Sequence, residues 1–278
     1  MYIASQLSSL NREHPITNKG ILDMKNLSLS LLMAASMSCS ALASAADVKA
    51  AKPTVVLVHG AFSDGSTWNK VIPLLEAKGL NVVAVQNPLT SFAEDTATTR
   101  RALARVKGPV VLVGHSYGGA VITEAGAKNE NVKALVYVAA FAPSAGESVG
   151  DLTKDYPTPS GFSHIDADDA GYLKLTSEGV SKHLAQDVTT EQARLIYATQ
   201  GPTNGAVFGE KVKDAAWENK PSRYIVSEQD HMLDINLQKV MAEKIHATVT
   251  TLNTSHAPHI SQPDAVASVI LHAVSAVK

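Results

Sequence analysis

A serine stands among glycines in the sequence GHSYGG at residues 114–119. The apolar run at residues 110–113 precedes it directly, and residues with a helical pattern follow it. A Gly-x-Ser-x-Gly sequence between a buried strand and a helix is typical of a nucleophile elbow, in which a strained turn exposes the serine hydroxyl. Small residues at Gly114 and Gly118 allow the strand and the helix to approach closely. The pattern therefore predicts that Ser116 is a nucleophile rather than part of an ordinary tight turn.

Acyl transfer at a serine also needs two backbone N–H groups that stabilise the developing oxyanion. One belongs to the residue after the nucleophile, here Tyr117, and the other comes from a loop after a neighbouring strand. The sequence LVHGAF at residues 57–62 ends such a strand. We expect Ala61 to be the second donor, with Phe62 as the alternative. His59 is interpreted as a residue that orders this loop.

The serine further needs a general base, and the loop after the last predicted strand supplies the candidates. Functional groups in doubly wound sheets gather at the carboxyl ends of the strands. Residues 252–266 follow such an end and contain two histidines. His256, just past the strand, is the expected base, and His259, nearer the final helix, is the alternative.

An acid that orients the base is expected in the loop at residues 226–234. Asp230 lies a few residues past its strand, and the chain order Ser, Asp, His agrees with the order expected for a nucleophile elbow. His231, the next residue, is interpreted as a surface or lid-facing side chain. The alternative acids are Glu228, which falls near the strand, Asp234, which is placed as a helix N-cap, and Glu147 or Asp151 after the previous strand.

Regular alternation of strand-like and helical segments predicts the fold that positions these residues. Continuous β-branched runs indicate strands buried on both faces, at residues 54–58, 81–86, 109–113, 133–140, 222–228 and 247–252. Helical segments are expected at residues 68–78, 94–107, 116–128, 235–246 and 264–277. The alternation predicts an α/β fold with a doubly wound, mostly parallel six-stranded sheet.

Residues 143–221 interrupt this alternation. They are rich in Pro, Gly, Ser and Asp, contain helical patches such as residues 189–200, and show no strand-like run. Since the segment is too long for an inert loop, we expect a helical cap inserted between two strands. Its larger apolar side chains are expected either to line a pocket or only to pack the cap: Leu195, Tyr197, Val207, Phe208 and Trp217.

The N-terminal region is expected to be a cleaved signal peptide. An apolar stretch ends in the small residues ASA at 43–45, the pattern that signal peptidase reads. We expect cleavage before Ala46, with residues 1–45 removed and residues 46–278 forming the mature, periplasmic or secreted domain. The stretch is short and interrupted by serines, so stable membrane insertion is not expected. Translation starts at Met1 or at Met24.

The composition excludes several classes of function. A net charge of −2 does not indicate electrostatic binding of nucleic acid or of an anionic membrane. The single cysteine, Cys39, lies in the predicted signal peptide, so the mature chain has neither disulfides nor a cysteine nucleophile. The histidines lack metal-binding spacing, and neither a metal nor a cofactor is expected. The oligomeric state and the natural substrate are not indicated.

With these residues assembled, the chain resembles the α/β-hydrolase superfamily, in particular small bacterial esterase-like members related to plant methylesterases and hydroxynitrile lyases. The resemblance rests on VHGAFSDGSTWNKVIPLL, VVLVGHSYGG, VYVAAFAPSAGES, YIVSEQDHMLDINLQKVMAEKI and TSHAPHISQPDAV. It implies a six-stranded parallel sheet with a helical cap and a catalytic triad of Ser116, Asp230 and His256. It also implies oxyanion donors at Ala61 and Tyr117.

Two positions depart from these relatives. In the hydroxynitrile lyases a lysine that handles the cyanide group follows the catalytic histidine, whereas this chain has Ala257. His231 stands where close bacterial relatives often have arginine. We therefore expect a serine hydrolase that cleaves a small-molecule carboxylic ester through an acyl-enzyme. Lyase or perhydrolase chemistry and a non-catalytic small-molecule receptor are the alternatives.

Overall fold

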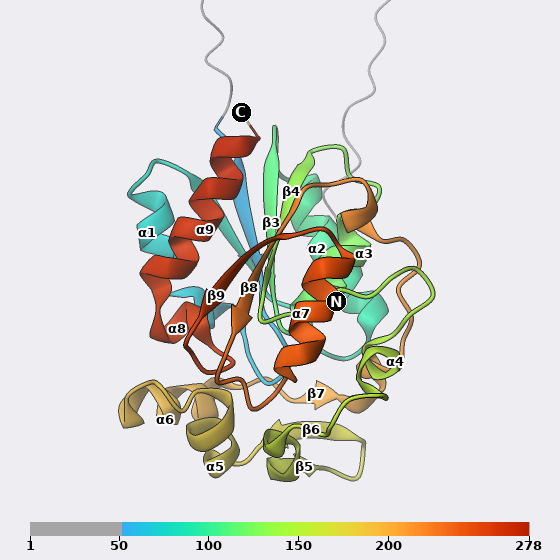
Figure 1. The fold of residues 1–278 in the computed structure, drawn as a ribbon, viewed down its shortest axis with the longest axis vertical. Coiled ribbons are helices and arrows are strands. Elements are labelled where there is room, and N and C mark those ends of the chain that lie inside the picture. The colour runs from blue at the N-terminus through green and yellow to red at the C-terminus, as the bar shows by residue number, and fades with distance from the viewer. Residues whose placement is uncertain (1–51, 278) are drawn as a thin grey trace, which may run out of the picture. The chain divides into compact units, whose positions relative to one another are not determined.

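The computed structural model describes residues 52–277 (Figure 1). The predicted signal peptide and its cleavage site before Ala46 lie outside the described residues. Within residues 52–277, no helix combines the length and the apolar character needed to cross a membrane.

Six parallel strands form the central sheet. They lie in the order β2-β1-β3-β4-β8-β9, and every neighbouring pair is parallel. Their bounds are β1 (Thr54–Val58), β2 (Asn81–Val85), β3 (Val110–His115), β4 (Val132–Val138), β8 (Ser222–Ser227) and β9 (Thr248–Leu252). The predicted six-stranded parallel sheet is thus confirmed, with each strand within two residues of its expected range.

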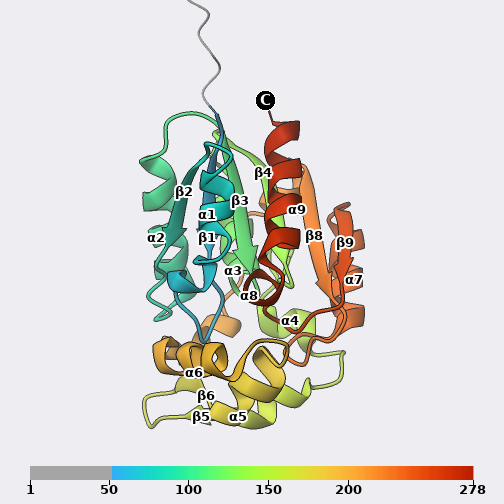
Figure 2. The same cartoon turned by 90° about the vertical axis from the view of Figure 1, so that its left-hand side faces the viewer.

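Helices cover both faces of this sheet (Figure 2). One face carries α1 (Ile72–Glu76) and α9 (Pro263–Ala276), and the other carries α2 (Phe92–Ala104), α3 (Gly118–Ala125) and α7 (Ile235–Lys244). Strand β1 shows why both faces are covered, because successive side chains of a strand point to opposite sides. Val56 and Val58 belong to the core beneath α3, whereas Val55 and Leu57 belong to the core beneath α9.

Local signals in the sequence account for where these helices begin. The Ser91 hydroxyl accepts from the N–H of Glu94 and starts α2. The Asp234 carboxylate accepts from the N–H groups of Asn236 and Leu237 and starts α7, so its predicted N-cap role is confirmed. The helix α9 begins at Pro263, whose fixed φ suits the first turn.

The segment between β4 and β8 forms a cap next to the carboxyl ends of the strands, at the lower end of Figure 1. It contains α4 (Val149–Thr153), α5 (Ser177–Gly179), α6 (Thr190–Thr199) and an antiparallel sheet of β5 (Ile165–Ala167), β6 (Tyr172–Leu175) and β7 (Thr203–Asn204). The expectation of a cap without strands is therefore wrong. Strands of two to four residues are too short to give a periodic pattern in the sequence.

Short helical turns complete the described chain. The 3₁₀ turns lie at Gly65–Trp68, Ser160–His164, Gly205–Phe208 and Ala216–Glu218, a π turn at Val180–Leu184, and the short helix α8 at Pro258–Ser261. Only the first and the last of these elements, Gly65–Trp68 and Pro258–Ser261, lie outside the cap.

Candidate active site

Ser116 follows β3 directly, in a backbone conformation that serine rarely adopts. Its φ is 52°, in the left-handed region. Its N–H donates to the Val138 carbonyl at 3.1 Å, and its carbonyl accepts from the N–H of Phe141 at 3.1 Å. Such a conformation costs on the order of 1–3 kcal/mol and persists where neighbouring groups fix it. The expected strained turn between strand and helix is present.

Glycines are required around this turn because backbone atoms crowd them. A Cβ added to Gly114 would lie 2.5 Å from the carbonyl oxygen of Gly118. A Cβ added to Gly118 would lie 2.6 Å from the carbonyl oxygen of His59. Side chains at either position would push α3 away from the sheet, as the spacing of the two glycines predicts.

The imidazole of His256 is paired with the carboxylate of Asp230. His256 Nδ1 lies 2.7 Å from Asp230 Oδ2, and both side chains are buried. Asp230 Oδ1 also accepts from the N–H groups of Met232 and Leu233, both at 2.8 Å. This pairing assigns the proton of His256 to Nδ1 and leaves Nε2 as the nitrogen that can accept one.

The other candidate acids have different partners. Asp234 caps α7, Glu147 pairs with Lys244 at 3.0 Å, and Asp151 forms the capping box of α4. Glu228 is exposed. The structure therefore brings Asp230, and none of these alternatives, to the histidine.

Gln238 supports Asp230 and was missed in the sequence. This fully buried side chain on α7 donates from Nε2 to Asp230 Oδ2 at 2.8 Å and accepts at Oε1 from the Ser227 N–H at 3.0 Å. It thereby links the carboxylate to the end of β8. A glutamine between Leu237 and Met241 on the apolar face of a helix was the signal that could have found it.

His259, the alternative base, packs against His115 and Trp68. Its ring is buried 4.3 Å from the ring of His115 and 4.6 Å from that of Trp68, measured between centroids. Burial, with a smaller contribution from His256, lowers the pKa of His259 to about 3. The structure places neither Asp230 nor the cavity described below against it.

The loop after β1 lies close to the nucleophile. A Cβ added to Gly60 would lie 2.8 Å from the Ser116 Cβ. The Phe62 N–H already donates to Thr203 Oγ1 at 3.0 Å. The N–H groups of Ala61 and Tyr117 have no hydrogen-bond partner within residues 52–277. Ala61 and Tyr117 thus stay the predicted oxyanion donors, whereas the N–H of Phe62 is engaged elsewhere.

His59 has the loop-ordering contacts expected of it. Its Nε2 accepts from the Asn87 N–H at 3.0 Å, and its Nδ1 donates to the Gly60 carbonyl at 2.8 Å. Burial lowers the pKa of His59, which favours this neutral form. His231 contacts the cap as interpreted, because its Nδ1 donates to the Lys182 carbonyl at 3.3 Å.

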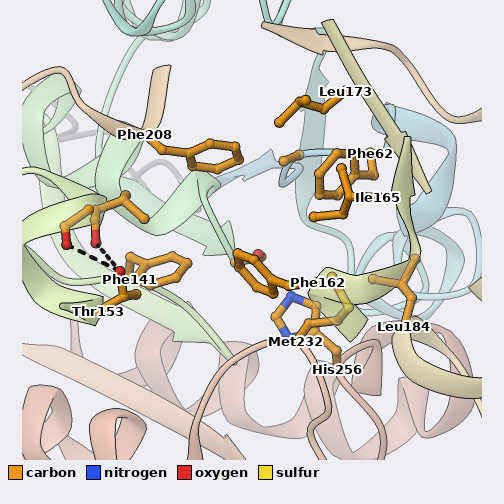
Figure 3. A pocket seen from close by; sticks show the side chains of 14 residues that line it. Phe62, Phe141, Thr153, Phe162, Ile165, Leu173, Leu184, Phe208, Met232 and His256 are labelled. Carbon is orange, nitrogen blue, oxygen red and sulfur yellow. Dashed lines mark hydrogen bonds between the residues drawn. The ribbon is translucent and has the colours of Figure 1, made fainter. Parts of the chain in front are cut away.

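A cavity of about 180 Å³ opens beside Ser116 and His256 (Figure 3). Four of the five phenylalanines of the chain line it, although aromatic residues make up only 5% of the sequence. Among the described residues, no lysine, arginine, aspartate or glutamate lines it. The lining residues are Ala61, Phe62, Ser116, Phe141, Val149, Gly150, Thr153, Phe162, Ile165, Leu173, Leu184, Phe208, Met232 and His256.

Of the cap side chains considered from the sequence, Phe208 alone belongs to this lining. Leu195 and Tyr197 are 59% and 43% exposed on α6. Val207 is buried in the core, and the Trp217 indole N–H donates to the Pro143 carbonyl. Within residues 52–277 there is also no cluster of three or more His, Cys, Asp or Glu side chains arranged to hold a metal ion.

Comparisons with known proteins find relatives that match most of the described chain. Residues 55–269 match the alpha/beta hydrolase family. Probable hydrolase R7 of Phoma sp. is 28% identical, over 79% of this chain and 97% of that protein. Methylesterase 2 of Arabidopsis thaliana is 27% identical, over 79% of this chain and 95% of that protein. A crystal structure of a pyrethroid hydrolase from Sphingobium faniae is 25% identical, with a TM-score of 0.69 over 81% of this chain and 98% of that chain.

Proposed function

Because the chain belongs to the α/β-hydrolase family, we propose that it is a serine esterase that cleaves small carboxylic esters through an acyl-enzyme at Ser116. The observation that carries the proposal is the His256–Asp230 pair, whose imidazole lines the same cavity as Ser116. Relatives named methylesterase and pyrethroid hydrolase support ester hydrolysis.

In the first half of the reaction, Ser116 Oγ attacks the ester carbonyl carbon while His256 Nε2 takes the hydroxyl proton. The Asp230 carboxylate stabilises the resulting imidazolium. The N–H groups of Ala61 and Tyr117 donate to the oxyanion of the tetrahedral intermediate. His256 then returns the proton to the leaving oxygen, the bond between that oxygen and the carbonyl carbon breaks, and the alcohol departs.

In the second half, His256 removes a proton from water, and the water oxygen attacks the acyl carbon. Collapse of the second tetrahedral intermediate breaks the bond to Ser116 Oγ, which recovers its proton from His256, and the carboxylic acid leaves. Within the described residues no hydrogen bond joins Ser116 Oγ to His256. This contact is often long in the absence of substrate and shortens in the complex.

The cavity favours a neutral, apolar substrate. A charged group entering it would lose its hydration without meeting an opposite charge, which costs several kcal/mol. Apolar groups gain about 25 cal/mol for each Å² removed from water. We therefore assign to this site esters with uncharged, hydrophobic acyl or alcohol groups.

Cyanohydrin cleavage is less well supported than ester hydrolysis. The lysine that handles cyanide in the resembling lyases is replaced by Ala257, which is buried. No other cation lines the cavity in its place within the described residues.

Labelling and turnover together test the proposal. Purified protein is treated with a fluorophosphonate probe and assayed with short-chain p-nitrophenyl esters, alongside Ser116→Ala. Loss of both labelling and turnover in the variant is expected. Turnover that survives the substitution overturns the role of Ser116, and labelling without ester turnover in the wild type overturns the esterase proposal in favour of lyase or receptor function.

We also propose that residues 1–45 direct export, from the sequence pattern described above. The intact mass of protein recovered outside the cytoplasm should then correspond to a chain that begins at Ala46.

A further inference from the structure

A hydrogen bond joins the cap to the loop that carries the predicted oxyanion donor. Thr203 lies in β7 and is completely buried. Its Oγ1 accepts from the Phe62 N–H at 3.0 Å, across 141 positions of the sequence. Phe62 follows Ala61 directly, so this bond acts on the peptide group next to the donor.

The conformation of Phe62 needs such a bond. Its φ is 56°, in the left-handed region that a phenylalanine rarely adopts. Residues held in this region persist where their surroundings fix them. Without an acceptor, the buried N–H of Phe62 would rotate toward another one, and the peptide plane between Ala61 and Phe62 would turn with it.

Thr203 is itself held on two sides. In the cap, it pairs with Leu173 of β6, and Leu173 lines the cavity. On the other side, the neighbouring Asn204 N–H donates to the Leu89 carbonyl at 2.8 Å. The hydroxyl of Thr203 is therefore held in place, and the loop after β1 is hydrogen-bonded to it through Phe62.

We propose that Thr203 is a positioning residue of the oxyanion hole, which it aligns by accepting the hydrogen bond of Phe62. This inference rests on the proposed ester hydrolysis. Oxyanion donors act when they lie 2.7–3.1 Å from the developing charge, so a small rotation of this loop weakens stabilisation of the transition state more than binding of the ester. The short cap strand β7 thereby has a role in the chemical step.

A series of substitutions at Thr203 tests the proposal. Thr203→Val keeps the shape and removes the acceptor, and we expect kcat to fall about tenfold with KM within about twofold. This loss is smaller than the 10²–10³ that follows deletion of a donor. Thr203→Ser keeps the hydroxyl and should retain most of kcat. If Thr203→Val folds poorly, the kcat of Thr203→Ala can be compared with that of Thr203→Ser, because these two variants differ only in the hydroxyl group.

Thr176→Val is the matched control. Thr176 is also a cap threonine whose Oγ1 accepts a backbone N–H, that of Gly179 at 3.0 Å, but its bond lies within the cap. Its substitution should weaken the cap and leave kcat unchanged. Equal loss of kcat in Thr176→Val and Thr203→Val would show a general effect of weakening the cap and would overturn the proposal.

Esters with acyl chains of different length distinguish a positioning role of Thr203 from an effect on the shape of the cavity. Every ester forms the same oxyanion, so the loss in kcat should be equal for p-nitrophenyl acetate and p-nitrophenyl hexanoate. A loss confined to the hexanoate, or an equal loss in Thr203→Ser, would show that Thr203 shapes the cavity and would overturn the proposal.

Hydrogen exchange separates this inference from the proposed function. The amide of Phe62 should exchange faster in Thr203→Val and Thr203→Ala than in Thr203→Ser, whether or not the protein is an esterase. Unchanged exchange overturns the positioning role. Ester turnover by Ser116→Ala at the wild-type rate overturns the proposed function instead. The two failures are thus distinguishable.

Discussion

His115 Nε2 donates a hydrogen bond of 2.8 Å to the backbone carbonyl of His256, 141 positions later in the chain. The rings of the two histidines are 4.8 Å apart between centroids. His115 immediately precedes the nucleophile, so the segment that carries Ser116 also holds the loop that carries the proposed base. Burial lowers the pKa of His115 well below its ordinary value, which keeps this contact between neutral groups.

Replacing His115 should disturb the position of His256. In His115→Phe the buried carbonyl of His256 loses its donor, a change worth about 1–3 kcal/mol, and we expect kcat/KM for p-nitrophenyl acetate to fall about tenfold. His115→Gln offers an N–H at a similar reach and should lose less. Steady-state kinetics and thermal melting of both variants check this. Wild-type kinetics in His115→Phe would show that the contact does not position the base.

Asp230→Asn should abolish most of the activity without unfolding the protein. Asp230 Oδ1 accepts two backbone N–H groups, so the new amide oxygen should take that side and the amide NH₂ should face His256 Nδ1, while the Gln238 amide that donates to Oδ2 in the wild type moves away. This would favour the tautomer with its proton on Nε2, which cannot accept one from Ser116, and kcat should fall on the order of 10⁴-fold.

Asp234→Asn is the control for this substitution, because asparagine also caps helices and Asp234 lies outside the site. Its kcat should equal that of the wild type. A similar kcat in both variants would contradict the role assigned to Asp230.

The apolar lining of the cavity should exclude charged esters. We expect kcat/KM for p-nitrophenyl hexanoate to exceed that for the mono-p-nitrophenyl ester of adipic acid by at least about 10², since the second carboxylate would be desolvated without a partner. Both esters have the same leaving group and similar chain length, so the charge is the main difference. Rates within about threefold of each other would show that the acyl chain does not enter this cavity.

The sheet and the nucleophile could be predicted because their signals are local. Most strands are short runs rich in β-branched residues, and Ser116 lies in a short motif between a strand and a helix. The preference for His256 over His259 rests only on the position of His256 just past the strand. The contact with Asp230 that distinguishes the two rings joins loops after two different strands, and no local pattern encodes it.

The contacts that support the site were missed for two physical reasons. The strand β7 has only two residues, so its sequence shows no alternating pattern. The hydrogen-bond partner of Thr203 is Phe62, 141 positions earlier in the chain. Gln238 occupies a position that the helical pattern assigns to the core. Its role follows from the hydrogen bond to Asp230, which no spacing in the sequence encodes.

The stability of the protein should decrease in mild acid because of His259. Neither of its ring nitrogens has a hydrogen-bond partner within the described residues, and burial lowers its pKa from an ordinary 6.5 to about 3. Above pH 6.5 the ring is neutral in both the folded and the unfolded chain and contributes no pH dependence. Between pH 6.5 and about 3 the unfolded chain binds a proton that the folded one does not. The free energy of unfolding therefore falls by up to about 1.4 kcal/mol per pH unit from this residue.

His259→Phe should reduce the dependence of the free energy of unfolding on pH by the contribution of about one proton, up to about 1.4 kcal/mol per pH unit. Phenylalanine can pack against Trp68 and does not titrate. Urea unfolding at pH 7, 6 and 5 measures the slope for the wild type and the variant. His272→Gln, a substitution on the exposed side of α9, is the control for the loss of a histidine that is not buried. Equal slopes for the wild type and His259→Phe would mean that His259 binds its proton as readily in the folded protein as in the unfolded chain, contrary to its burial between Trp68 and His115.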